Sequence, residues 1–188
     1  MTSPRLAAYE TLLAQNSLRV FFVHAGLLVL YSPRVRRWNY LQRTMDYEYP
    51  SIRGKRLFVE ILRKMLEYAN MDLFSGSIDE LDREAGKSID EMVKSELASE
   101  SVEILSGVRG TFQRKSYRIT QRGADMFESQ IRPLLPTPLL SLAQRIHSNR
   151  ENFKDDDADS VLGCLKKLMD ETPMEEGKPK VGVEDERK

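Results

Sequence analysis

Five basic side chains lie close together in the middle of this 188-residue chain, and their types suit contacts with phosphate groups. Residues 104–122 carry five Lys or Arg and no Asp or Glu. Lysine and arginine neutralise phosphates, and basic side chains can also enter the minor groove of DNA. These candidate nucleic-acid contacts are Arg109, Arg114, Lys115, Arg118 and Arg122. The alternative is a solvated hairpin whose charges discourage edge-to-edge pairing of strands.

The segments around these residues are predicted to form a β-hairpin. Residues 102–105 have the apolar content of a strand, and residues 106–110 are rich in turn-forming types. Residues 112–119 then return as a second strand. The tip and the return strand carry most of the basic cluster, so one local unit can present these charges together.

The return strand is predicted to run directly into a helix. Tyr117 and Ile119 alternate with polar residues, which is the period of a half-buried strand. Thr120 is a good N-cap for a helix over residues 120–132. Gly123 has no side chain, so the new helix can lie close against a neighbouring segment.

Two capping boxes precede the hairpin and predict two short helices. Ser77-Ile78-Asp79-Glu80 recurs as Ser88-Ile89-Asp90-Glu91. In each box the serine hydroxyl can accept from the third amide, while the glutamate reaches back to the cap. Gly86 lies between the boxes and suits a helix C-terminus with positive φ. Two short helices, starting at residues 78 and 89 and joined by a tight turn, have the helix-turn-helix signature.

The second of these helices, over residues 89–98, carries charges of both signs. Lys87 just before it and Lys94 within it are further candidate DNA contacts. Asp90, Glu91 and Glu96 are predicted on its exposed face, where carboxylates opposite phosphates are costly. Either this helix lies shallowly and the hairpin makes the contacts, or the module contacts protein instead.

Helices are predicted on both sides of this region. Residues 52–71 form the clearest one, because their apolar residues follow the i, i+3, i+4 spacing. Residues 5–31 precede it, and residues 138–150 and 160–170 follow the hairpin. The charged residues 171–188 are expected to be disordered.

One helical segment suggests self-association. Val20 to Leu30 is apolar nearly all round, and such a helix must be buried in the core or in a partner. We expect it to carry more apolar surface than one small domain can bury, which predicts a homodimer through the flanking helices.

Residues 52–132 resemble winged helix-turn-helix transcription regulators, particularly the PadR-like and MarR-like groups. The resemblance rests on the order of the elements and on Tyr117-Arg118-Ile119-Thr120-x-x-Gly123. In those families a similar tyrosine-x-leucine-threonine-x-x-glycine segment often closes the wing and starts the next helix. The resemblance implies a mainly α protein with three helices plus a hairpin wing, double-stranded DNA as the partner, and a role in transcription regulation.

The resulting expectation is a winged helix domain at residues 51–135 between two helical parts. Residues 1–50 would form an N-terminal helical extension that serves for dimerisation, and residues 136–170 the C-terminal helices. The second hypothesis is a winged helix that contacts protein, as an adaptor without direct DNA binding. The acidic stretch of residues 77–103, with nine Asp or Glu against three Lys or Arg, favours that hypothesis.

Several classes of site and of protein are not indicated. One cysteine and two histidines cannot assemble a Cys/His zinc site or an intramolecular disulfide. No catalytic triad pattern, phosphate-binding glycine loop or framed carboxylate pair is visible, so we expect neither an enzyme nor a cofactor. The apolar run is too short for a bilayer span, and no signal-peptide pattern starts the chain. A cytoplasmic protein without membrane contact fits best.

A few other residues could bind ligands but have simpler interpretations. The basic residues of 34–43 alternate with Trp38 and Tyr40, which could stack on nucleic acid but more often form a core. His24 is expected to be a hydrogen-bonded core or interface residue. Asp155 to Asp157 lack the glycine and distal glutamate of a calcium loop, so helix capping is expected.

Overall fold

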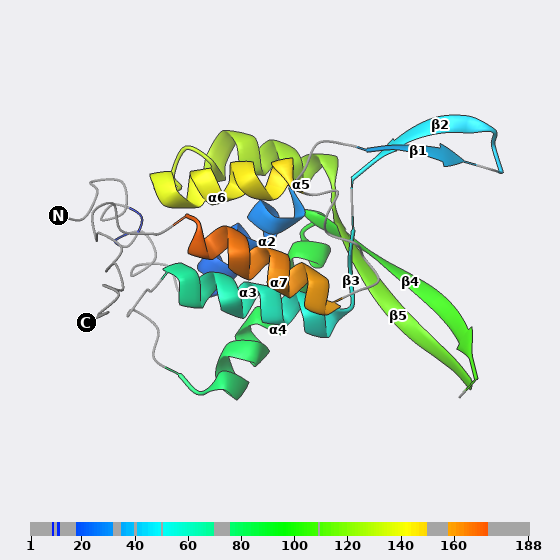
Figure 1. The fold of residues 1–188 in the computed structure, drawn as a ribbon, viewed down its shortest axis with the longest axis horizontal. Coiled ribbons are helices and arrows are strands. Elements are labelled where there is room, and N and C mark those ends of the chain that lie inside the picture. The colour runs from blue at the N-terminus through cyan, green and yellow to red at the C-terminus, as the bar shows by residue number, and fades with distance from the viewer. Residues whose placement is uncertain are drawn as a thin grey trace, which may run out of the picture.

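The structure, a computed structural model, describes residues 9, 11, 18–31, 35–39, 41–49, 51–69, 76–108, 110–149 and 158–172. It is mainly helical with a small three-stranded antiparallel sheet, as expected at this level from the sequence. The elements are α2 (Leu18–Leu30), β1 (Val35–Asn39), β2 (Thr44–Glu48), β3 (Ser51–Arg53), α3 (Lys55–Ala69), α4 (Ile78–Lys94), β4 (Ala98–Gly107), β5 (Gly110–Ile119), α5 (Gln121–Met126), the π-helical η1 (Phe127–Ile131), α6 (Thr137–Ser148) and α7 (Ala158–Asp170). Figure 1 shows the β1–β2 and β4–β5 hairpins projecting from one side of the helical body.

Helix α2 is the central element of the core. Nearly every residue from Phe21 to Leu30 is buried, and α2 contacts α3, α4, α6, η1 and β5. The prediction that its apolar surface exceeds what one domain can bury is therefore wrong, because this chain's own elements cover it. That removes the reason the sequence offered for a homodimer. Among the residues that the structure describes, none of the helices has both the length and the apolar content of a bilayer span.

Helix α3 confirms the clearest helix prediction, with a later start. The apolar residues that define its inner face are all buried: Leu57, Phe58, Ile61, Leu62, Met65, Leu66 and Ala69. The segment before it forms the short strand β3, and Gly54, with a φ of 93°, turns the chain from strand to helix. Residues 35–39 and 44–48 form an antiparallel hairpin, where the sequence led us to expect a helical extension.

Helix α4 corrects the prediction of two short helices. The capping box at Ser77 is confirmed, because Glu80 N donates to Ser77 Oγ and Ser77 N donates to Glu80 Oε2. Ser88 is not a cap. It is fully buried inside the helix, and its hydroxyl donates to the Glu84 carbonyl at 2.8 Å. This bond satisfies the buried hydroxyl within the helix, which continues through Gly86 without a turn.

The C-terminus of α4 closes with two characteristic backbone hydrogen bonds. Leu97 N donates to Met92 O at 2.9 Å, and Glu96 N donates to Val93 O at 3.1 Å, as in a Schellman motif. Glu96 has a φ of 59° at the position where glycine is preferred. The sequence had placed Glu96 on the exposed face of a helix, but it lies beyond the helix end.

Glu96→Gly is expected to stabilise the protein by about 0.5–1 kcal/mol, because glycine adopts positive φ without the steric penalty of a side chain. Chemical denaturation followed by circular dichroism measures this change. Glu91→Gly is the matched control and should destabilise by about 1 kcal/mol, since it places glycine inside the same helix. A loss of stability in Glu96→Gly would contradict this description of the helix end.

The sheet has the strand order β3-β5-β4, and both of its pairings are antiparallel. Strands β4 and β5 pair along their full length from Ala98↔Ile119 to Gly107↔Gly110, which makes a longer hairpin than predicted. Strand β3 pairs only with residues 116–118 of β5. The outer part of the hairpin is thus a two-stranded ribbon, and it extends beyond the helices in Figure 1.

The strand-to-helix junction after the hairpin is confirmed. Tyr117 and Ile119 are buried, and Thr120 caps α5 by accepting from Gly123 N at 3.0 Å. The segment that Gly123 approaches is the backbone of Leu97: a Cβ added to this glycine would lie 2.0 Å from the Leu97 carbonyl oxygen. The helix then passes into η1 instead of remaining α-helical to residue 132.

Helices α6 and α7 confirm the two C-terminal helix predictions within a few residues. Val161, Leu165 and Leu168 are buried as expected. The acidic turn at residues 155–157 and most of the tail, residues 173–188, lie outside the described residues.

Candidate nucleic-acid interface

Helix α4 turns one face to the core and another to solvent. Its buried residues contact α2 and α3 and are Ala85, Ser88, Ile89 and Met92. Four exposed residues at i, i+4, i+7 and i+11 lie on one outer face, which we call the outer stripe: Arg83, Lys87, Asp90 and Lys94. Three of the four are cations, so the uninterrupted helix aligns basic residues that a turn at Gly86 would have separated.

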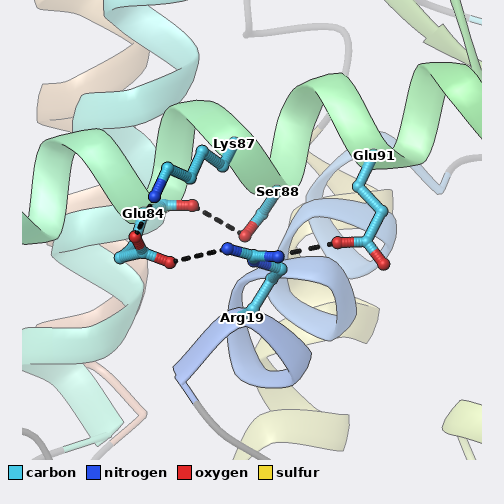
Figure 2. Close-up of polar contacts among 5 residues, drawn as sticks. All are labelled: Arg19, Glu84, Lys87, Ser88 and Glu91. Carbon is cyan, nitrogen blue, oxygen red and sulfur yellow. Dashed lines mark hydrogen bonds and ion pairs between the residues drawn. The ribbon is translucent and has the colours of Figure 1, made fainter.

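Two carboxylates of α4, Glu84 and Glu91, pair with an arginine of α2. Arg19 Nη2 lies 3.2 Å from Glu84 Oε2, and Arg19 Nε lies 3.9 Å from Glu91 Oε2. Figure 2 shows the guanidinium between these two carboxylates, beside Ser88. Lys87 Nζ lies 2.7 Å from the other oxygen of Glu84. Hydrogen bonds from Lys87 and then Arg19 hold the pKa of Glu84 below its usual value.

Each carboxylate that the sequence placed opposite phosphates has a cation partner from another element. The pairs are Asp90 with Lys55, Glu91 with Arg19, and Glu96 with Arg122. These pairs are exposed, so each contributes only about 0–1 kcal/mol to folding. Their main effect is to neutralise the negative charge of α4 and the residues after it. Lys94 forms no ion pair with a described residue, so its positive charge is not neutralised in this way.

The hairpin cations are also paired, which corrects one premise of the sequence interpretation. Arg114 lies directly across the hairpin from Glu103, with Arg114 Nη2 3.3 Å from Glu103 Oε2. Lys115 Nζ lies 2.9 Å from Glu100 Oε1. The expectation that no acid compensates these residues is wrong, because the partners come from β4, just before the basic stretch begins. Any phosphate contact by Arg114 or Lys115 would compete with these glutamates.

Charges of the β4–β5 hairpin and of the outer stripe influence one another. The hydrogen bond from Lys115 holds the pKa of Glu100 below its usual value, and Lys55 adds to this effect. The pKa of Lys115 is raised by Glu100 first and also by Asp90 of α4. Lys115 of the hairpin therefore lies within electrostatic range of Asp90, in the C-terminal half of the outer stripe.

The remaining predicted contacts are more scattered. Arg118 is half-buried at the centre of the sheet, opposite Ser51 on one side and Ser99 on the other. Arg122 is exposed in the first turn of α5 and pairs with Glu96 at 3.4 Å. Arg109 lies outside the described residues.

Arg83 is a candidate contact that sequence reasoning missed. It is exposed on the outer stripe, one turn before Lys87. The signal was present in the sequence, because residues 83, 87 and 94 share one helix face. This shared face was not recognised, because the sequence interpretation divided the helix at Gly86.

Comparison of the chain with family models, with curated proteins and with solved structures returns no match.

Proposed function

We propose that this protein binds double-stranded DNA as a winged helix, with α3 and α4 as the helix-turn-helix and β4–β5 as the wing. The observation that carries the proposal is the order of the elements together with the sheet. Helix α2 is followed, after the β1–β2 hairpin, by strand β3, helices α3 and α4 and then the β4–β5 hairpin, and β3 pairs with β5. This arrangement resembles the regulators discussed above, with the helix pair shifted from 78–98 to α3 and α4.

The charges of α4 support the same proposal. In a helix-turn-helix the second helix lies in the major groove, and its solvent-facing residues meet the DNA. Here that face is the outer stripe, whose only acid pairs with Lys55. The acids of the neighbouring face pair with Arg19 and are directed toward α2. Because these acids are paired, α4 should repel phosphates much less than its sequence suggests.

Replacing Lys87 and Lys94 together with alanine is expected to weaken DNA binding on every sequence. Each lysine that neutralises a phosphate releases a counterion, so losing two contacts lowers the slope of log affinity against log salt by about two units. Fluorescence anisotropy with a duplex of mixed sequence, titrated at several KCl concentrations, measures the slope.

Lys166→Ala combined with Lys167→Ala is the matched control. It removes the same charge from exposed positions on α7, which packs against α3 and α6. The control should keep the wild-type slope. Equal slopes in the two double variants would remove α4 from the DNA interface.

A protein-binding winged helix is the second candidate, and one observation favours it. The outer part of the hairpin exposes large apolar side chains: Val102, Ile104, Val108 and Phe112. Binding to DNA phosphates would leave these apolar side chains exposed to water, whereas binding to a protein surface could bury them. If the wild-type chain does not bind the duplex even at low salt, this candidate replaces the first. The homodimer stays a prediction, which light scattering of the chain tests.

A further inference from the structure

A cavity of about 930 Å³ lies between α2, α4 and the α5–η1 segment. Pockets of about 300–1,000 Å³ hold most small-molecule ligands. The apolar part of its wall comes from all three regions and consists of Val20, Val23, Met92, Leu97 and Met126. The space therefore has the size and the lining that a small organic molecule requires.

The charges around the mouth of the cavity are balanced. Arg19 faces Glu91, and Arg122 pairs with Glu96 just outside the wall. Asp125 accepts a hydrogen bond from Gln121 Nε2 at 2.7 Å. A charged ligand would have to displace these partners or enter an apolar space without one, which is costly. The electrostatics therefore favour an uncharged ligand.

One polar side chain is buried in the wall. His24 is only 8% exposed. Its Nδ1 lies 3.0 Å from the hydroxyl oxygen of Tyr9, and the Tyr9 ring stacks against the imidazole. Within the described residues, no hydrogen bond is recorded for its second nitrogen, Nε2, although the residue lines the cavity. Burial lowers the pKa of His24 to about 4, so the ring is neutral near pH 7. We assign the Tyr9 hydroxyl as the donor to Nδ1, so that Nε2 carries the proton and can donate.

We propose that this cavity binds an uncharged, largely apolar small molecule with one hydrogen-bond acceptor, such as a carbonyl oxygen, which accepts from His24 Nε2. The aliphatic and methionine side chains bury the body of the ligand. His24 supplies the buried donor of the wall, whereas Ser95, Ser129 and Gln130 are exposed. The histidine therefore fixes the orientation of the ligand, because an acceptor placed against the apolar part of the wall would lose its hydrogen bond to water.

The test uses 6-propionyl-2-dimethylaminonaphthalene, an uncharged dye with one carbonyl group whose emission shifts to the blue in apolar surroundings. Titration of the full chain with this dye should give a saturable blue shift with one site per chain. His24→Phe keeps the ring volume and removes the donor, so it should weaken dye binding roughly fivefold, as expected for one neutral hydrogen bond.

Two variants test whether the dye occupies the cavity. Val23→Trp fills it from α2, and Ser129→Trp fills it from an exposed position at the mouth, where folding is not at risk. Both should abolish the saturable shift. Ile78→Trp is the control, since it adds the same indole at an exposed position outside the cavity and should bind the dye as the wild type does.

Four results would overturn the proposal. The wild type could give no saturable shift, or Ser129→Trp could bind the dye as tightly as Ile78→Trp does. Light scattering could also reveal a dimer that Ser129→Trp abolishes, which would make a second copy the occupant. Unchanged dye affinity in His24→Phe would remove the histidine from the site. The titration contains no DNA, so its outcome is independent of the proposed function.

Discussion

Gly123→Ala is expected to destabilise the protein by about 3 kcal/mol or more, a loss at the upper end for overpacking of a core. The added Cβ would lie 2.0 Å from the Leu97 carbonyl oxygen and 2.9 Å from Ile119 Cγ1. The carbonyl cannot move away easily, because it accepts from Thr120 N at 3.1 Å and Thr120 Oγ1 also at 3.1 Å. Chemical denaturation of wild type and variant measures the free energy of unfolding.

Gly86→Ala is the matched control for this loss. A Cβ at Gly86 would meet only Lys55 Cε, at 3.9 Å, and the residue lies inside α4. Alanine there should stabilise the protein by about 0.5–1 kcal/mol, because it is the better helix former. A turn at Gly86 with positive φ would give the opposite sign. If Gly123→Ala cost less than about 1 kcal/mol, the close approach of α5 to Leu97 would be wrong.

Elements with a strong local signal were predictable from the sequence. Helices α3, α6 and α7 repeat their apolar residues at helical spacing over several turns, and each buries that face. The hairpin and the Thr120 cap were predictable for the same reason: hairpin partners are at most 21 positions apart, at Ala98↔Ile119, and the cap bond spans three residues. Local chemistry decides such elements.

Elements that depend on distant contacts were missed. Strand β3 has three residues and forms because β5 offers an edge more than sixty positions later. The second serine-glutamate repeat looked like a helix start, but Ser88 is fully buried inside an uninterrupted α4, which packs on α2 and α3. The local sequence is compatible both with a new helix start at Ser88 and with a continuous helix, and packing against distant helices decided between them.

The charge pattern of the candidate site also depended on distant residues. Arg19 and Glu84 are 65 positions apart, and Lys55 and Asp90 are 35 apart. Counting charges in a window of the sequence therefore overstated both the acidity of α4 and the excess of positive charge on the hairpin. The cations are visible in the sequence, but which of them have an acid partner could be seen only in the fold.

The stability of the protein is expected to fall by about 2 kcal/mol between pH 7 and pH 5, because His24 resists protonation in the folded state. Burial lowers its pKa from 6.5 to about 4. In that range the unfolded chain binds a proton that the folded chain does not, so acid favours unfolding. Denaturant titrations at several pH values measure the free energy of unfolding at each.

The carboxylates do not obscure this effect, since those with shifted values titrate lower. The pKa values of Glu80, Glu84, Glu100 and Glu128 are all held below the usual 4.5, so the stability they contribute is lost mainly as the pH falls through 4.5 and below, with only a small part lost above pH 5. His24→Phe should therefore flatten the dependence between pH 5 and pH 7. His147→Phe, which removes the other histidine of the chain, is the control. If both variants lost the same share of the slope, or if neither did, His24 would not be the group that resists protonation, and the neutral donor assigned to the cavity would lose its basis.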